Sequence, residues 1–139
     1  MDQYDLIYVD DESTMTAIFE QMVKLKYRQW RAAAFSDSQS LYERITAKQI
    51  AARVWIIDLM MPKVNGVEIA QAIRQSGDSE AKLIAYTALD PQTLSRNPGY
   101  REGLHLFERV IGKQEGLMKL LAGLESSYLR NIKVQTRPS

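Results

Sequence analysis

The most informative segment of this sequence is VWIIDLMMPKVNG, residues 54–66. Its first four residues are apolar throughout, which is typical of a strand that is covered on both faces in a parallel sheet. An acidic residue, Asp58, follows directly where this predicted strand ends. The segment therefore predicts a buried strand that delivers a carboxylate to the edge of a sheet.

Short apolar runs alternate with longer amphipathic segments along the rest of the chain. Besides residues 54–57, the predicted strands cover residues 4–9, 30–35, 83–86 and 109–111. The predicted helices cover residues 13–26, 37–48, 65–75 and 115–129. We expect Ser13 to cap the first of these helices, and Ser36 or Asp37 the second. This alternation favours an α/β fold with a parallel sheet.

The segment between residues 88 and 108 is the least regular. Asp90 and Pro91 predict the start of a helix, because proline is tolerated in a first turn. The Asn-Pro-Gly sequence at 97–99 predicts its end, since proline cannot continue a helix and glycine resolves the turn. We therefore expect a short or broken fourth helix here.

Length and composition narrow the class of protein. The 139 residues suit one domain, which we place at residues 1–130, with residues 131–139 as a C-terminal tail or the start of a linker. The absence of cysteine excludes disulfides and thiolate metal sites. The 18 basic and 17 acidic residues are mixed along the chain, so direct nucleic-acid binding is not expected. Without a signal peptide or a membrane-spanning apolar run, a cytoplasmic protein is expected.

Polar side chains follow four of the predicted strands at the point where each strand ends. Asp10 and Asp11 follow the first strand, Asp58 the third, Thr87 the fourth and Lys113 the fifth. The carboxyl ends of parallel strands meet at one edge of a sheet, where ligands bind. We therefore expect these five side chains to lie close together.

The three aspartates predict a cation at this edge. Two carboxylates about 4 Å apart repel by roughly 4 kcal/mol at an effective dielectric constant near 20. Either one of them takes up a proton or a cation lies between them. Carboxylates without histidine or cysteine select Mg²⁺, Mn²⁺ or Ca²⁺, and Mg²⁺ favours one or two carboxylates together with a phosphate oxygen. This combination indicates phosphoryl chemistry, with Asp58 as the nucleophile and Thr87 and Lys113 stabilising the phosphoryl oxygens.

Four pieces of this sequence together resemble the receiver domain of bacterial two-component response regulators. They are VDDESTM (residues 9–15), IIDLMMPKVNG (residues 56–66), YTA (residues 86–88) and Lys113. The resemblance implies a flavodoxin-like, doubly wound sheet of five parallel strands in the order 2-1-3-4-5, with five helices. It also implies a phosphorelay switch that takes its phosphoryl group from a sensor histidine kinase or a phosphotransfer protein.

The resemblance assigns roles residue by residue. Asp58 resembles the phospho-acceptor, and Asp11 the direct ligand of Mg²⁺, with Mn²⁺ as the alternative ion. Asp10 resembles an assisting metal ligand, and Met60 lies where the family donates a main-chain carbonyl to the metal. Thr87 and Lys113 resemble the hydroxyl and the cation that close on the phosphoryl group. The apolar stripe of the last helix, foremost a core feature, is also a candidate homodimer surface.

Two substitutions and one length difference depart from the family pattern. Gln114 stands where a proline usually follows the lysine, and Val110 where an aromatic residue usually lies. The stretch from Thr87 to Lys113 is also several residues longer than usual. All three departures fall on the output side, so a pseudo-receiver that acts as a phosphorylation-independent interaction module stays open as the alternative. A phosphatase of the haloacid-dehalogenase type is disfavoured, because Leu59 and Met60 follow Asp58 where that class resembles Asp-x-Asp.

Overall fold

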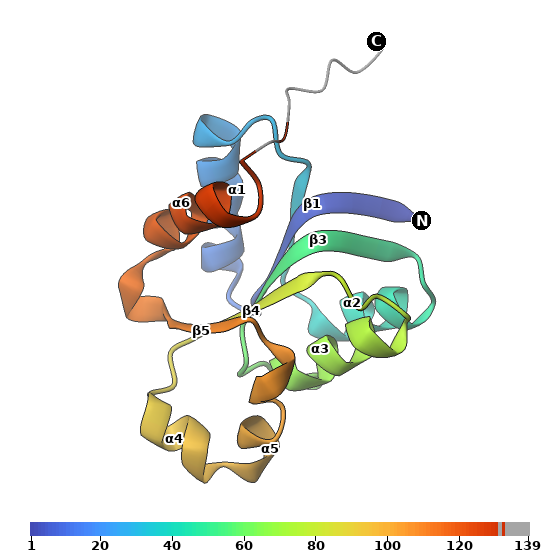
Figure 1. The fold of residues 1–139 in the computed structure, drawn as a ribbon, viewed down its shortest axis with the longest axis vertical. Helices are drawn as coiled ribbons and strands as arrows, with labels where there is room; N and C mark the ends of the chain where they lie inside the picture. The colour runs from blue at the N-terminus through green and yellow to red at the C-terminus, as the bar shows by residue number, and fades with distance from the viewer. Residues whose placement is uncertain (131, 133–139) are drawn as a thin grey trace.

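The computed structural model describes residues 1–130 and residue 132, and shows one parallel sheet between two layers of helices (Figure 1). The five strands are β1 (Asp2–Val9), β2 (Ala32–Phe35), β3 (Ile50–Ile57), β4 (Lys82–Thr87) and β5 (Arg109–Gly112). Their order across the sheet is β2-β1-β3-β4-β5, and all four pairings are parallel. The predicted fold class and strand order are confirmed. Apart from Ile132, the predicted tail at residues 131–139 lies outside the described residues.

Helices cover both faces of the sheet. They are α1 (Ser13–Lys26), α2 (Ser38–Thr46), α3 (Gly66–Gln75), α4 (Pro91–Arg96), α5 (Pro98–Arg101) and α6 (Leu117–Ser127). Two 3₁₀ turns, η1 (Leu104–Leu106) and η2 (Lys113–Glu115), flank β5. Helices α1 and α6 pack on one face, and α2 and α3 on the other (Figure 1). No helix in residues 1–130 is long and apolar enough to cross a membrane.

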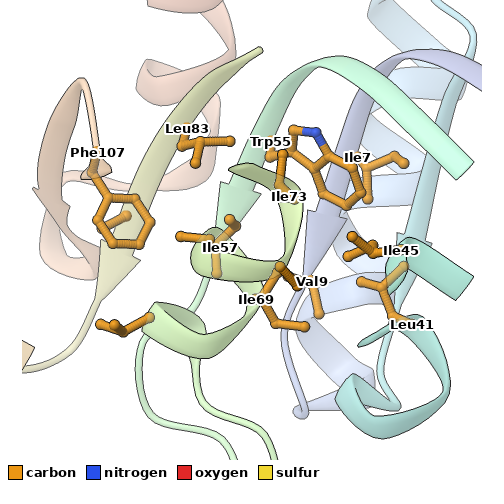
Figure 2. Packing of buried hydrophobic residues seen from close by; sticks show 14 of the residues in the cluster. Ile7, Val9, Leu41, Ile45, Trp55, Ile57, Ile69, Ile73, Leu83 and Phe107 are labelled. Atoms are coloured by element: carbon orange, nitrogen blue, oxygen red, sulfur yellow. The ribbon is translucent and has the colours of Figure 1, made fainter. Parts of the chain in front are cut away.

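Each face of the sheet has its own apolar core, because successive side chains of a strand point to opposite faces. Trp55 and Ile57 of β3 point toward α2 and α3, where Figure 2 shows them among Leu41, Ile45 and Ile69. Their neighbour Ile56 belongs to the opposite core, beneath α1 and α6. The central strands are buried on both faces, as the apolar run at residues 54–57 predicts.

The strand register places the carboxyl ends of the strands along one edge of the sheet, with β4 extending two residues beyond the end of β3. Val9, the last residue of β1, pairs with Phe35 of β2 and with Ile57 of β3. At the other side of the sheet, Thr87 of β4 pairs with Gly112 of β5. The residues that follow these strands therefore start from one edge.

The fourth helix is broken, as predicted. Asp90 caps α4 by accepting a hydrogen bond from the Thr93 N–H, with Pro91 in the first turn. The helix ends before Asn97, whose own side chain then caps the short helix α5 that starts at Pro98. Proline therefore ends one helix and begins the next at the same point of the chain.

Several bounds of the predicted elements are wrong. The third strand begins at Ile50 rather than at residue 54, and the second and last helices end at Thr46 and Ser127 rather than at residues 48 and 129. The last helix begins at Leu117 rather than at residue 115, because residues 113–115 form a 3₁₀ turn and Gly116 has a φ of +87°. The second strand begins at Ala32, because Trp30 lies in the preceding turn, stacked on Tyr27. Ser13 does not cap α1: Glu12 occupies that position, and no side chain caps the helix.

Candidate functional site

Three aspartates gather at the carboxyl edge of the sheet, as the sequence predicts. Asp10 follows β1 directly, and Asp58 follows β3. One carboxylate oxygen from each of Asp10, Asp11 and Asp58 lies within 4.8 Å of the others. Asp10 is fully buried and Asp58 is 4% exposed, whereas Asp11 is open to solvent. We call these three residues the acidic cluster.

One lysine reaches the acidic cluster from the far side of the sheet. The Nζ atom of Lys113 lies 2.8 Å from Asp10 Oδ2 and 3.5 Å from Asp58 Oδ2. Burial lowers the pKa of Lys113, but the hydrogen bond to Asp10 and the charge of Asp58 outweigh this and raise the pKa. The lysine is therefore charged, yet one positive charge cannot balance three carboxylates.

Burial and the neighbouring negative charge both disfavour the ionised form of Asp58. Burial, followed by the charge of Asp10, raises the pKa of Asp58 from 3.8 to about 7. Lys113 and the Met60 N–H, which donates to Asp58 Oδ1 at 3.3 Å, lower this pKa without restoring its ordinary value. A hard divalent cation would relieve the same repulsion, so the acidic cluster is consistent with a Mg²⁺ site.

In the loop after Asp58, the backbone of Gly66 lies very close to the backbone of Asp58 and Leu59. The Gly66 N–H donates to the Leu59 carbonyl at 3.0 Å, which folds the loop back on itself. A Cβ atom at Gly66 would lie 2.8 Å from the Leu59 Cα and closer still to the Asp58 carbonyl oxygen. Only glycine fits here, and α3 then begins with a capping box between Asn65 and Glu68. The start of α3 thereby anchors the loop that carries Asp58.

The contacts of the other predicted site residues, Thr87 and Met60, do not test the roles predicted for them. Thr87 ends β4 and is 1% exposed, and its hydroxyl accepts a hydrogen bond from the Leu89 N–H at 3.0 Å. Met60 is 58% exposed beside Asp58. Their roles as switch hydroxyl and main-chain metal ligand stay predictions. Val110, at the usual aromatic position, is exposed on β5.

Sequence reasoning missed Tyr8. Its hydroxyl donates a hydrogen bond to Asp10 Oδ2 from within the core. Burial, together with this hydrogen bond, raises the pKa of Tyr8 far above its usual range, so the phenol stays neutral and is the donor. The available signal was its position, because residues two apart on a strand point to the same face.

Comparison with known proteins agrees with this geometry. The family model described as "Response regulator receiver domain" matches residues 6–115. The transcriptional regulatory protein TrcR of Mycobacterium tuberculosis is 25% identical over 127 residues, which is 86% of this chain and 47% of that protein. The chain thus spans about half the length of this relative.

Solved structures share the fold at low sequence identity. The receiver domain of the Francisella response regulator 1452 superposes with a TM-score of 0.71 at 18% identity, over 91% of this chain and 98% of that one. The response regulator TrrA of Thermotoga maritima, in complex with Mg²⁺-BeF, gives 0.64 at 19% identity over the same shares of the two chains. At such identities the likeness shows the fold alone.

Proposed function

The chain belongs to the response regulator receiver domain family, and from this premise we propose that Asp58 is its phosphoryl acceptor. Members of this family are signalling switches rather than enzymes in their own right, and they work with histidine kinases. The acidic cluster is typical of receivers that accept a phosphoryl group. The observation that carries the proposal is the buried Asp58 carboxylate, held 3.5 Å from the charged Lys113 and next to two further aspartates.

The chemistry needs only a carboxylate nucleophile and charge stabilisation. One carboxylate oxygen of Asp58 attacks the phosphorus of a phosphohistidine, and the new O–P bond forms as the N–P bond breaks. The electron pair of the broken bond stays on the imidazole of the donor. The donor would be a cognate sensor histidine kinase or a phosphotransfer protein.

The residues around Asp58 divide the remaining tasks. Asp11, the exposed member of the acidic cluster, would hold Mg²⁺ or Mn²⁺ directly, with Asp10, Asp58 and the Met60 carbonyl completing the site. When bound, the ion would neutralise charge on the carboxylates and on the phosphoryl oxygens. Lys113 would pair with one phosphoryl oxygen. The Thr87 hydroxyl would donate to another, because its present bond accepts from the Leu89 N–H and leaves its own hydrogen free.

The consequence of phosphorylation would be a changed interaction surface. The relative TrcR is named a transcriptional regulator, and this chain matches about half of it. We infer a cytoplasmic bacterial switch whose output is a protein contact rather than direct nucleic-acid binding. A homodimer through α6 stays a prediction: Leu117, Leu120 and Leu124 are buried in the core, whereas Met118 is exposed.

The test is phosphorylation by a small-molecule donor. Incubation with acetyl phosphate and Mg²⁺ should add one phosphoryl group, detected by intact-mass spectrometry, and Asp58→Asn should abolish the addition. Asp37→Asn is the matched control, because asparagine also caps α2 and Asp37 lies outside the acidic cluster. Equal labelling of Asp58→Asn would move the nucleophile elsewhere.

The same experiment separates the second candidate, a pseudo-receiver. The exposed Val110, in place of the aromatic residue that usually couples to the threonine, is the observation that favours it. A wild-type protein that binds Mg²⁺ but takes no phosphoryl group from acetyl phosphate or from any histidine kinase would support this alternative.

A further inference from the structure

Beneath the acidic cluster lies a buried tyrosine that the phosphoryl chemistry does not itself require. Tyr8 is fully buried on β1, with its ring packed against Phe19 at 5.1 Å and edge-on to Tyr86 at 6.3 Å between centroids. Its hydroxyl donates to Asp10 Oδ2. A phenylalanine would fill the same apolar space, so the hydroxyl is the part of this side chain that packing leaves unexplained.

The Asp10 carboxylate is held by three donors. Oδ2 accepts hydrogen bonds from the Tyr8 hydroxyl and from Lys113 Nζ at 2.8 Å, and Oδ1 accepts one from the Glu12 N–H at 3.0 Å. Each carboxylate oxygen has two acceptor positions, so Oδ2 is filled whereas Oδ1 keeps one position free. Donors on both oxygens fix the plane of the carboxylate and leave Oδ1 as the oxygen with capacity for a further ligand.

We propose that Tyr8 is a positioning residue, which orients Asp10 so that Oδ1 serves the divalent cation while Oδ2 stays engaged in the core. This inference rests on the proposed function, because it assigns a role within the same metal site. Tyr8, which lies in the apolar core, would thus join the residues at the edge of the sheet that form the metal site.

Loss of the hydroxyl would change the site in a specific way. Oδ2 would gain a free acceptor position in a fully buried environment, where an unpaired group is costly. Lys113 would be the one remaining donor to Oδ2, so the Asp10 carboxylate could rotate about its Cβ–Cγ bond. Partners that orient a metal ligand from behind typically contribute tenfold or more to metal affinity.

The experiment compares Mg²⁺ binding by the unphosphorylated protein and its variants, followed by backbone amide NMR. Tyr8→Phe should weaken Mg²⁺ binding roughly tenfold, while the rate of phosphorylation by acetyl phosphate at saturating Mg²⁺ changes less than about threefold. Tyr86→Phe is the matched control. Tyr86 is also buried in this cluster, but its hydroxyl contacts the Lys113 carbonyl oxygen at 3.4 Å instead of a carboxylate, so Mg²⁺ affinity should stay within about twofold.

A double-mutant cycle shows whether Tyr8 acts through Asp10. In an Asp10→Ala background, which removes the acceptor of the Tyr8 hydroxyl, Tyr8→Phe should no longer alter Mg²⁺ affinity. An equal loss in both backgrounds, or unchanged affinity of Tyr8→Phe, would overturn the inference. Should Tyr8→Phe not fold, the ring Cζ resonance of Tyr8 in the wild type, identified by its contact with Phe19, should shift with Mg²⁺; an unchanged resonance would overturn it equally.

Failure of the proposed function has a different signature. If the wild-type protein itself binds no Mg²⁺ and accepts no phosphoryl group, the proposed function fails. If the wild type does both and Tyr8→Phe matches it in Mg²⁺ affinity, the role of Tyr8 alone is wrong.

Discussion

The carboxyl group of Asp58 lies in surroundings that favour its neutral form. Burial and the charge of Asp10 raise its pKa from 3.8 to about 7. Because the pKa is higher in the folded state, ionisation of Asp58 destabilises the fold. The penalty is absent below the unfolded pKa, grows between about pH 4 and about pH 7, and is complete above that range.

Replacement of Asp58 should therefore stabilise the metal-free protein in a pH-dependent manner. The gain in free energy of unfolding for Asp58→Asn over the wild type should rise from near zero at about pH 4 to at most roughly 4 kcal/mol at about pH 8. Urea unfolding in the presence of a chelator, repeated across this range, measures the difference. A gain that does not vary with pH would show that the Asp58 carboxyl titrates normally.

Asp11 is the member of the acidic cluster that is open to solvent, and so it is the one best placed to meet an incoming cation. Mg²⁺ at one hundred times its Kd should stabilise the wild type by about 2.7 kcal/mol. Asp11→Ala should lose most of this gain in thermal unfolding. Glu12→Ala is the control, because it removes a neighbouring exposed acid that lies outside the acidic cluster, and this variant should keep the stabilisation by Mg²⁺. Equal losses of stabilisation in both variants would indicate general charge screening.

At the scale of single residues, the sequence predicted that the aspartates and Lys113 meet at one edge, but not that the buried Tyr8 contacts Asp10 from the core. The aspartates and Lys113 were found because parallel strands end at a common edge. Tyr8 was missed because alternation along a strand shows that Tyr8 and Asp10 lie on the same face, but not that the Tyr8 hydroxyl reaches the Asp10 carboxylate. A hydrogen bond between residues two apart on one strand depends on side-chain geometry that only the packed core determines.

Among the elements, the connection from β3 to α3 carries the tightest steric constraint. Gly66→Ala would place a methyl group against the backbone of Asp58 and Leu59, so the loop or the helix must shift. We expect a loss of about 1–3 kcal/mol in the free energy of unfolding, measured with urea. Gly123→Ala is the control, because a Cβ atom there meets open space within α6 and should stabilise the helix by about 0.5–1 kcal/mol. A Gly66→Ala variant as stable as the wild type would contradict the constraint.

Prediction of the elements from sequence succeeded where the period of the apolar residues was clear. Helix α1 has the predicted bounds, and the break in the fourth helix follows from its two prolines. The start of α6 was wrong because the apolar stripe does not distinguish a 3₁₀ turn from the first turn of an α-helix. There, the positive φ of Gly116 separates η2 from α6.

Across the whole molecule, the two cores and the site depend on the same sheet. Strand β3 supplies Trp55 and Ile57 to one core and Ile56 to the other, and then Asp58 to the acidic cluster. The class of fold was predictable because the apolar run at residues 54–57 is that of a strand buried on both faces. The strand order came from the family resemblance, since local patterns do not say which strands are neighbours.

The register of β1 against β3 links the geometry of the acidic cluster to correct folding. Val9 opposite Ile57 is the pairing that sets Asp10 beside Asp58. A slip of β3 by a single position would turn Trp55 out of its core and at the same time carry Asp58 away from its partners. A misregistered chain would therefore lose the packing of its hydrophobic core and the grouping of its aspartates together, so an intact acidic cluster is evidence of correctly paired strands.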